Sequence, residues 1–248
     1  MEVMNGEWRA SAAYLYVLTL DNISLAWEYL RRSPQYVVDW QNGGQRTDAA
    51  RWGLTAFENP SLNARTAQPM WLSLPEGQLR IVPLEDDPLS RTFSLWRVPG
   101  TKVLCHDGSR LQLTVEIHGT RAHIAIHPAL QSGDRFGFGF SSGTPLPQQA
   151  SRVEAAVRLV HGDHSTGAVH AVRREALVHM RMLQALDATH AKASQREAAR
   201  ILFGLDEVLR HWHPDSDLRA KIRHYLHRGR ALMRSDYLGL LYPSGRSR

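Results

Sequence analysis

The chain has 248 residues, of which 43% are hydrophobic and 22% charged, proportions typical of a folded globular protein and too apolar for a disordered one. Its single cysteine, Cys105, excludes an internal disulfide framework, thiolate zinc fingers and iron–sulfur clusters. No run of about 18 apolar residues is present, which excludes a membrane-spanning helix, and Glu2 and Glu7 disfavour a secretory signal. We therefore expect a cytoplasmic protein with no membrane partner.

Positive charge is concentrated in the C-terminal part of the chain. Residues 151–248 contain 17 Lys/Arg and 10 Asp/Glu, whereas residues 1–150 contain 13 and 14. Such a one-sided positive field indicates a polyanionic partner, most often nucleic acid. The loop Ser141–Pro147 separates the two parts, because its prolines cannot continue a helix. We expect three domains: a helical module over 1–70, an antiparallel β region over 71–150 and a helical DNA-binding domain over 151–248.

The first predicted helices lie near the N-terminus. Asn22 can cap a short helix that runs through Arg32. Ser33-Pro34 ends this helix and begins another, with Ser33 as the cap and Pro34 in the first helical position. Arg31 and Arg32 are interpreted as a solvated helix end. The aromatic centre of the module is predicted to consist of Trp27, Tyr36 and Trp40.

A β region follows an irregular, proline-rich stretch over residues 45–100. From Lys102 onward, apolar residues recur at every second position, which is the pattern of strands with one buried face. The alternating apolar residues are Leu111, Leu113, Val115 and Ile117, followed by Ala122, Ile124 and Ile126. Asp107-Gly108 and Gly119-Thr120 provide turn signals on either side of the first run. The sequence therefore predicts an antiparallel meander of about three strands and an α+β fold class.

The C-terminal part is predicted to be helical, beginning with an amphipathic helix over roughly 168–190. Ser194-Gln195-Arg196-Glu197 is a capping box, in which Ser194 and Glu197 satisfy each other's backbone amides. Ala198 and Ala199 follow, and Gly204 ends the helix. A short capped helix with small residues is typical of the first helix of a helix-turn-helix, although any short bundle helix can show the same pattern.

The strongest functional signal is a last long helix, predicted from Ser216-Asp217 to about Arg234. One stripe of this helix is apolar: Leu218, Ile222, Tyr225, Leu226, Gly229, Leu232 and Met233. The basic residues lie away from the stripe: Arg219, Lys221, Arg223, His224, His227, Arg228, Arg230 and Arg234. This density of like charge is unfavourable unless an anion docks there. The pattern favours nucleic-acid binding, because phosphates supply the anion and arginine also contacts guanine edges; a solvated face is the alternative.

Three further patterns do not indicate catalysis or metal binding. Residues 139–143 match G-x-S-x-G, but prolines follow where the helix of that motif must begin. His123 and His127 would lie about 13 Å apart on one strand face, too far to share a metal ion. His161 and His164 lack a third ligand at suitable spacing. We therefore expect no enzyme activity, no metal and no cofactor.

Two stretches of the chain resemble known families. Residues 26–36, AWEYLRRSPQY, are similar to the A-W-E-[FY]-L-R-R-N-P-x-Y signature of a small bacterial transcriptional regulator-like domain, with Ser33 in place of asparagine. The C-terminal part resembles the RovC-like DNA-binding domain at residues 183–187, 194–197, 218–219 and 228–232, and the strand segment 107–113 adds to the match. The resemblance implies a variant helix-turn-helix, promoter binding, a homo-oligomer such as a hexamer, and activation of type VI secretion genes.

We interpret the chain as a transcriptional activator that binds promoter double-stranded DNA as a homo-oligomer, with the meander and the N-terminal module either supporting assembly or contacting RNA polymerase. The residues expected to contact DNA are Gln195, Arg196, Arg200, Arg210, Arg219, Lys221, Arg223, His227, Arg228 and Arg230. The short segment Leu205–Trp212 is an alternative reading helix, in which case Arg210 matters more than Arg223. A rival function is a non-catalytic oligomeric adaptor whose basic face binds an acidic protein.

Overall fold

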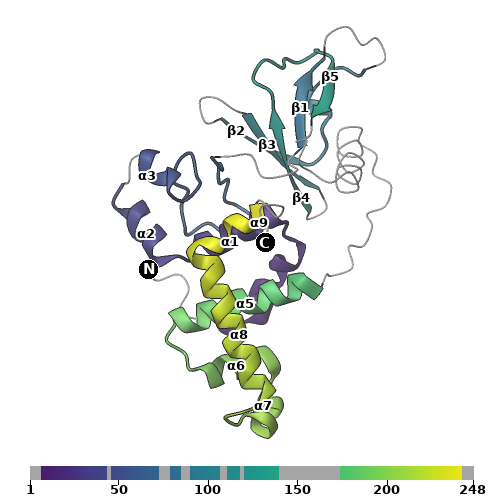
Figure 1. Cartoon of the computed structure of the whole chain (residues 1–248). Helices are drawn as coiled ribbons and strands as arrows, with labels where there is room; N and C mark the ends of the chain where they lie inside the picture. The colour runs from purple at the N-terminus through teal and green to yellow at the C-terminus, as the bar shows by residue number, and fades with distance from the viewer. Residues whose placement is uncertain are drawn as a thin grey trace, which may run out of the picture. The chain divides into compact units, whose positions relative to one another are not determined.

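The computed structural model describes residues 7–43, 46–72, 79–84, 90–106, 111–117, 120–139 and 174–241 (Figure 1). The chain forms two compact units, which are described separately. Unit 1 consists of Met1–Asn42, Asn59–Thr66 and His170–Leu240, and unit 2 consists of Gly43–Glu58, Ala67–Val169 and Leu241–Arg248. The N-terminal helices therefore share a unit with the C-terminal helices, a pairing that the sequence patterns did not indicate.

Unit 1 begins with two 3₁₀ helices and two α-helices. Their bounds are η1 Glu7–Arg9, η2 Ser11–Thr19, α1 Asn22–Leu30 and α2 Pro34–Gln41. The cap of α1 is Asp21, whose carboxylate accepts a 2.8 Å hydrogen bond from the Ser24 amide, so the predicted cap Asn22 is wrong by one position. Ser33 and Pro34 begin α2 as predicted. In both cases a short polar side chain satisfies an amide that the first helical turn leaves unpaired.

The C-terminal helices of unit 1 follow the predicted order. Their bounds are α5 Arg174–His190, α6 Gln195–Phe203, α7 Leu205–His211 and α8 Asp217–Ala231, followed by a π-helical turn, η4 Leu232–Asp236, and α9 Leu238–Leu241. Residues 168–173 of the predicted long helix lie outside the described part of the chain. Helix α5 is central because it packs against η2, α6 and α8.

Aromatic side chains fill the core of unit 1 around α1. Trp27 and Tyr36 are fully buried, with ring centroids 5.7 Å apart in an edge-on arrangement. The indole Nε1 of Trp27 donates a 3.0 Å hydrogen bond to the Leu62 carbonyl, which ties the segment Asn59–Thr66 to the unit. Trp40, the third aromatic residue predicted for this centre, is half-buried.

Unit 2 contains a five-stranded sheet with the order β2-β3-β4-β1-β5. The strand bounds are β1 Leu79–Pro83, β2 Thr101–His106, β3 Leu111–Ile117, β4 Thr120–Ile126 and β5 Phe136–Gly139. Strands β2, β3 and β4 pair antiparallel in chain order, which confirms the predicted meander. The sequence did not predict β1, which runs parallel to β4, or β5, which pairs antiparallel with β1.

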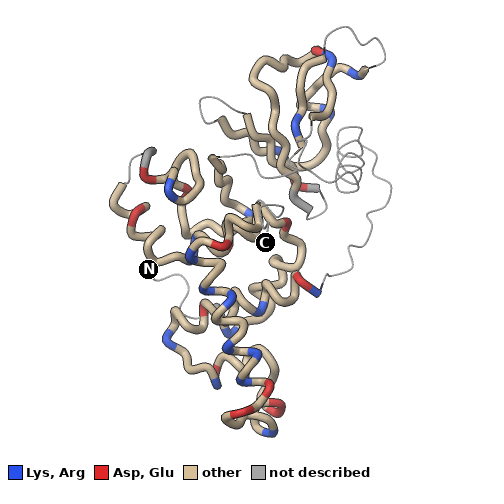
Figure 2. The backbone as a smooth tube through the Cα atoms, viewed as in Figure 1, with Lys and Arg blue, Asp and Glu red and all other residues tan. Residues whose placement is uncertain are grey.

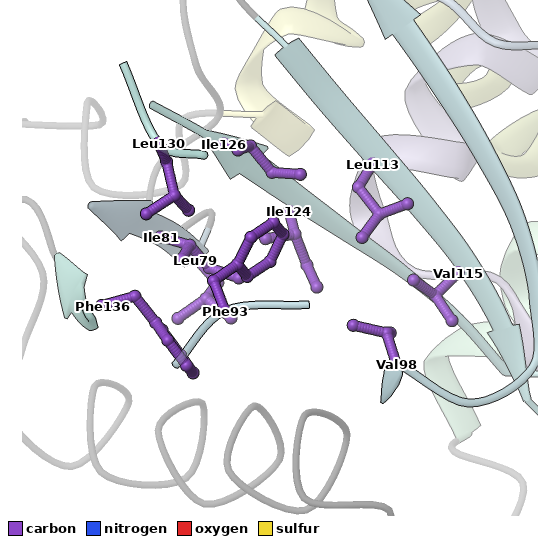
Figure 3. Close-up of a cluster of buried hydrophobic side chains, with 10 residues drawn as sticks. All are labelled: Leu79, Ile81, Phe93, Val98, Leu113, Val115, Ile124, Ile126, Leu130 and Phe136. Atoms are coloured by element: carbon purple, nitrogen blue, oxygen red, sulfur yellow. The ribbon is translucent and has the colours of Figure 1, made fainter. Parts of the chain in front are cut away.

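One face of this sheet carries a hydrophobic core (Figure 3). The residues of the core are Leu79, Ile81, Phe93, Val98, Leu113, Val115, Ile124, Ile126, Leu130 and Phe136. The alternation of strands β3 and β4 places Leu113, Val115, Ile124 and Ile126 on the same side. The rest of unit 2 includes a short helix, α3 Arg46–Ala50, and a bridge between Leu54 and Trp71.

Candidate nucleic-acid interface

Helix α6 begins with the predicted capping box. The Ser194 hydroxyl accepts a 3.2 Å hydrogen bond from the Glu197 amide, and Glu197 Oε2 accepts a 2.8 Å bond from the Ser194 amide. The hydrogen bonds from Ser194 also lower the pKa of Glu197. Because these bonds fix the first turn, Gln195 and Arg196 project into solvent from the N-terminal end of the helix. Helix N-termini attract anions such as phosphate.

Small and aromatic side chains hold α6 in place. Ala198 and Ala199 are buried, which lets α6 approach its neighbours closely, and Arg200 is exposed on the outer side. The ring of Phe203 stacks on Tyr225 of α8 with centroids 6.3 Å apart. Gly204 then connects α6 to α7 with a φ of 97°, a conformation that favours glycine.

Helix α8 separates apolar and basic residues onto different faces. All seven predicted stripe residues are buried along α8 and η4. The basic side chains point outward: Lys221, Arg223, His227, Arg228 and Arg230 are exposed, and Arg219 is half-buried. Figure 2 shows the resulting series of lysines and arginines along α8. In the described part of the chain, no ion pair joins any of these Lys/Arg side chains to a carboxylate.

Close packing against α5 sets the position of α8. A Cβ atom added at Gly229 would lie 3.1 Å from Leu186 Cγ. The backbone of α8 at Gly229 therefore packs closely against the Leu186 side chain of α5. Burial lowers the pKa of His179 in α5, and the charge of Arg228 in α8 acts in the same direction. His179 Nδ1 lies 2.8 Å from the hydroxyl of Tyr29 in α1. Helix α8 thus packs on α5, and α5 in turn contacts α1.

Helix α7 differs from α8 in charge. Asp206 and Glu207 occupy its first turn and are exposed, whereas Arg210, also exposed, lies in its last turn. Leu209 is 64% exposed. Two carboxylates at one end would repel a phosphate backbone, so the charge distribution favours α8 over α7 as the helix that meets DNA.

A buried ionic network, not foreseen from the sequence, joins the two ends of the chain within unit 1. Arg32 Nε donates to Asp187 Oδ1 at 2.8 Å and Arg32 Nη2 donates to Asp187 Oδ2 at 2.9 Å. Arg32 and Asp187, which is in α5, thus form a bidentate ion pair. The hydroxyl of Tyr14 donates to the same carboxylate at 2.6 Å. Glu28 accepts hydrogen bonds from Arg32 and, at 2.8 Å, from Arg31 Nε.

This network corrects the interpretation of Arg31 and Arg32 as a solvated helix end. Both residues are buried, with 8% and 7% of their surface exposed. Glu28 in α1 lies three residues before Arg31 and four before Arg32, a spacing at which opposite charges pair on a helix, so the sequence contains a local indication of this ion pairing. The other acidic partner, Asp187, is distant in the chain and is the lone carboxylate within the buried stretch of α5. The network links α1 to α5 and thereby holds the N-terminal helices against the C-terminal helices, among them the basic helix α8.

Acid is expected to destabilise unit 1 through Glu28. Burial alone would raise the pKa of this carboxyl, but Arg31, Arg32 and the Ala64 amide lower it to about 2 from a reference value of 4.5. A lowered folded-state pKa contributes stability that is present above about pH 4.5 and is lost as the pH falls toward 2. Urea unfolding should therefore show that the stability difference between the wild type and Glu28→Gln narrows through this pH window. A constant difference would contradict the assignment.

The described residues contain no cluster of three or more His, Cys, Asp or Glu side chains arranged to hold a metal ion. No described helix has both the length and the apolar character needed to cross a membrane. The candidate residues His161 and His164, and the serines of the G-x-S-x-G pattern, lie outside the described part of the chain.

Comparison with protein families gives three matches along the chain. Residues 144–242 match a DNA-binding domain described as that of a type VI secretion (T6SS) transcription factor, RovC. Residues 7–57 match a proteobacterial transcriptional regulator-like domain, and residues 78–122 match a domain of unknown function. A search of curated proteins found no match. The chain thus combines a transcriptional regulator-like domain with a RovC-type DNA-binding domain, and it is a DNA-binding transcriptional regulator.

Proposed function

We propose that the chain is a cytoplasmic activator that recognises promoter sequences in double-stranded DNA, with α8 as its main contact. The observation that carries this proposal is the exposed basic face of α8, which lacks ion pairs in the described part of the chain and lies opposite a buried apolar stripe. Exposed cations without ion pairs are available to neutralise phosphates, which releases counterions and favours binding to a duplex. The match to a DNA-binding domain over this region supports the same assignment.

The basic residues of α8 have two roles in this proposal. Lys221 and the arginines neutralise phosphates, which fixes the orientation of the protein but carries no sequence information. Arginines that reach the major groove read guanine through paired hydrogen bonds. The α8 residues proposed to contact DNA are Arg219, Lys221, Arg223, His227, Arg228 and Arg230.

Helix α6 is proposed to position the protein on the DNA backbone. Its capped N-terminal turn presents backbone amides together with Gln195 and Arg196, and Arg200 lies one turn further on the exposed side. The alternative in which α7 reads the bases makes Arg210 the principal contact. The exposed Asp206 and Glu207 of α7 weigh against that alternative.

Activation is proposed to involve assembly and a contact with RNA polymerase. The family resemblance suggests a homo-oligomer such as a hexamer, and type VI secretion genes as targets. The rival function is an adaptor that uses the same basic face to bind an acidic protein. The two functions predict different responses to salt and to DNA sequence.

Retardation assays with the full-length protein across a salt series separate these functions. If the five Lys/Arg side chains at positions 219, 221, 223, 228 and 230 each neutralise a phosphate, the logarithm of affinity should fall with a slope of roughly −4 to −5 against the logarithm of salt. A promoter fragment should also bind more tightly than a scrambled fragment of equal length. A flat salt response without sequence preference would favour the adaptor.

A further inference from the structure

Strand β2 forms one end of the five-stranded sheet in unit 2, and no described strand pairs with its outer edge. In the described part of the chain, β2 pairs only with β3. Val103 and Leu104, near its middle, are 38% and 47% exposed. The other end of the sheet differs, because the Phe136 amide of β5 donates a 3.4 Å hydrogen bond to the Arg91 carbonyl. The two edges of the sheet are therefore not equivalent.

The residues of β2 itself carry none of the features that usually block an edge strand. Open edges recruit other strands unless a proline, a bulge or an outward charge prevents it. Strand β2 has no proline, and its six residues pair one to one with β3. Its single Lys/Arg side chain, Lys102, donates hydrogen bonds to the carbonyls of Val98 at 2.7 Å and Gly100 at 3.1 Å. These bonds hold the ammonium group over the preceding turn.

We propose that β2 pairs antiparallel with β2 of a second copy of the chain, with Leu104 opposite Leu104 of that copy. A two-fold axis perpendicular to the sheet allows only registers that place one residue opposite its own equivalent. With Leu104 on the axis, Val103 faces Cys105 of the second copy and Lys102 faces His106. Apolar side chains then meet apolar ones, and polar side chains meet polar ones. A register centred on Val103 would instead place Lys102 opposite Leu104.

The pairing joins the two sheets into one continuous sheet through main-chain hydrogen bonds. Leu104 lies directly opposite Leu113 in the sheet, so it projects from the face that carries the core. Contact between the two Leu104 side chains therefore extends that apolar face across the axis. The inference rests on unit 2 alone and holds whether or not unit 1 binds DNA.

Engineered cysteines in the full-length protein test this register. Directly opposed residues have Cα atoms about 4.5–5.5 Å apart, within disulfide reach, whereas residues displaced by two positions across the edge are roughly 8 Å apart. Leu104→Cys with Cys105→Ser should therefore form a covalent dimer under mild oxidation. Val103→Cys with native Cys105 should also do so, because these two positions face each other. Val103→Cys with Cys105→Ser is the matched control and should stay monomeric on a non-reducing gel.

Failure of Leu104→Cys/Cys105→Ser to cross-link, or equal cross-linking of the control, would overturn the proposal. A second test needs no cysteine. Leu104→Lys should weaken self-association in sedimentation experiments by at least about tenfold, because it places two charges on the axis. Leu15→Lys, at a similarly exposed site in unit 1, should leave it unchanged. Circular dichroism checks that each variant folds, and unchanged assembly of folded Leu104→Lys would also refute the proposal.

Discussion

Replacing Arg219 and Arg223 with glutamate is expected to lower the affinity for promoter DNA by about a hundredfold or more. A lost contact to a base or phosphate costs about 1–3 kcal/mol, and each new carboxylate adds repulsion from the backbone. Neither arginine forms an ion pair in the described part of the chain, so the substitutions remove no partner that α8 needs for folding. Circular dichroism should remain that of the wild type, and the salt slope should become shallower by about two.

A matched control separates this local effect from the change in net charge. Arg91 and Arg97 are exposed residues of unit 2, which does not include α8. Arg91→Glu with Arg97→Glu changes the net charge by the same amount and should reduce affinity far less. Equal losses in the two double variants would mean that general attraction, rather than α8, drives binding. An unchanged affinity in the α8 variant would refute the assignment of this helix.

Replacing Asp187 with alanine is expected to lower the free energy of unfolding of unit 1 by about 3–5 kcal/mol. The substitution removes the carboxylate that accepts two hydrogen bonds from Arg32, so that Arg31 and Arg32 are left to share Glu28. An excess buried positive charge is strongly destabilising. The hydroxyl of Tyr14 loses its acceptor at the same time. Because domains are stabilised by only about 5–15 kcal/mol, a large fraction of the protein should unfold at moderate urea concentration.

The control for this prediction is Asp215→Ala, which removes an exposed carboxylate in the loop before α8. It should change the unfolding free energy by less than about 0.5 kcal/mol. The double variant Arg32→Met/Asp187→Leu should recover part of the stability lost in Asp187→Ala, since it removes the excess buried positive charge and leaves Glu28 paired with Arg31. A loss below about 1 kcal/mol in Asp187→Ala would show that the network contributes little. Urea titration followed by the helical circular dichroism signal measures all three.

Local patterns predicted those parts of the fold whose causes lie within a few residues. The capping box at Ser194 and Glu197 was predicted because both partners lie within one helical turn. The separation of α8 into buried and exposed faces followed from its 3.6-residue period. Strands β3 and β4 were predicted because their apolar residues alternate strictly.

Features that depend on distant partners were not predicted. Arg32 is buried because Asp187, 155 residues away in the chain, provides its counter-charge, and no local pattern shows that pairing. Strand β1 is short and contains both Arg80 and Pro83, while β5 has two glycines among four residues. Proline and glycine weaken a strand signal, so these two strands depend on pairing with β4 and with each other.

The candidate interface shows the same division. The positions of the α8 cations could be predicted, because a helix that buries one stripe must expose the opposite face. The support of that face from the N-terminal helices could not, because it depends on the contact of α1 with α5 through Arg32, Asp187 and Tyr14. The sequence likewise left the choice between α7 and α8 open. The exposed acidic first turn of α7 now favours α8.

Site-specific photo-cross-linking tests the contact of α8 with DNA most directly. A photoreactive amino acid is placed at His224, an exposed position on α8, or at Gln35, an exposed position on α2, and each protein is irradiated with a labelled promoter fragment that it retards. The account predicts a covalent protein–DNA adduct from position 224 and none from position 35. Retardation of the DNA without any adduct from position 224 would contradict it.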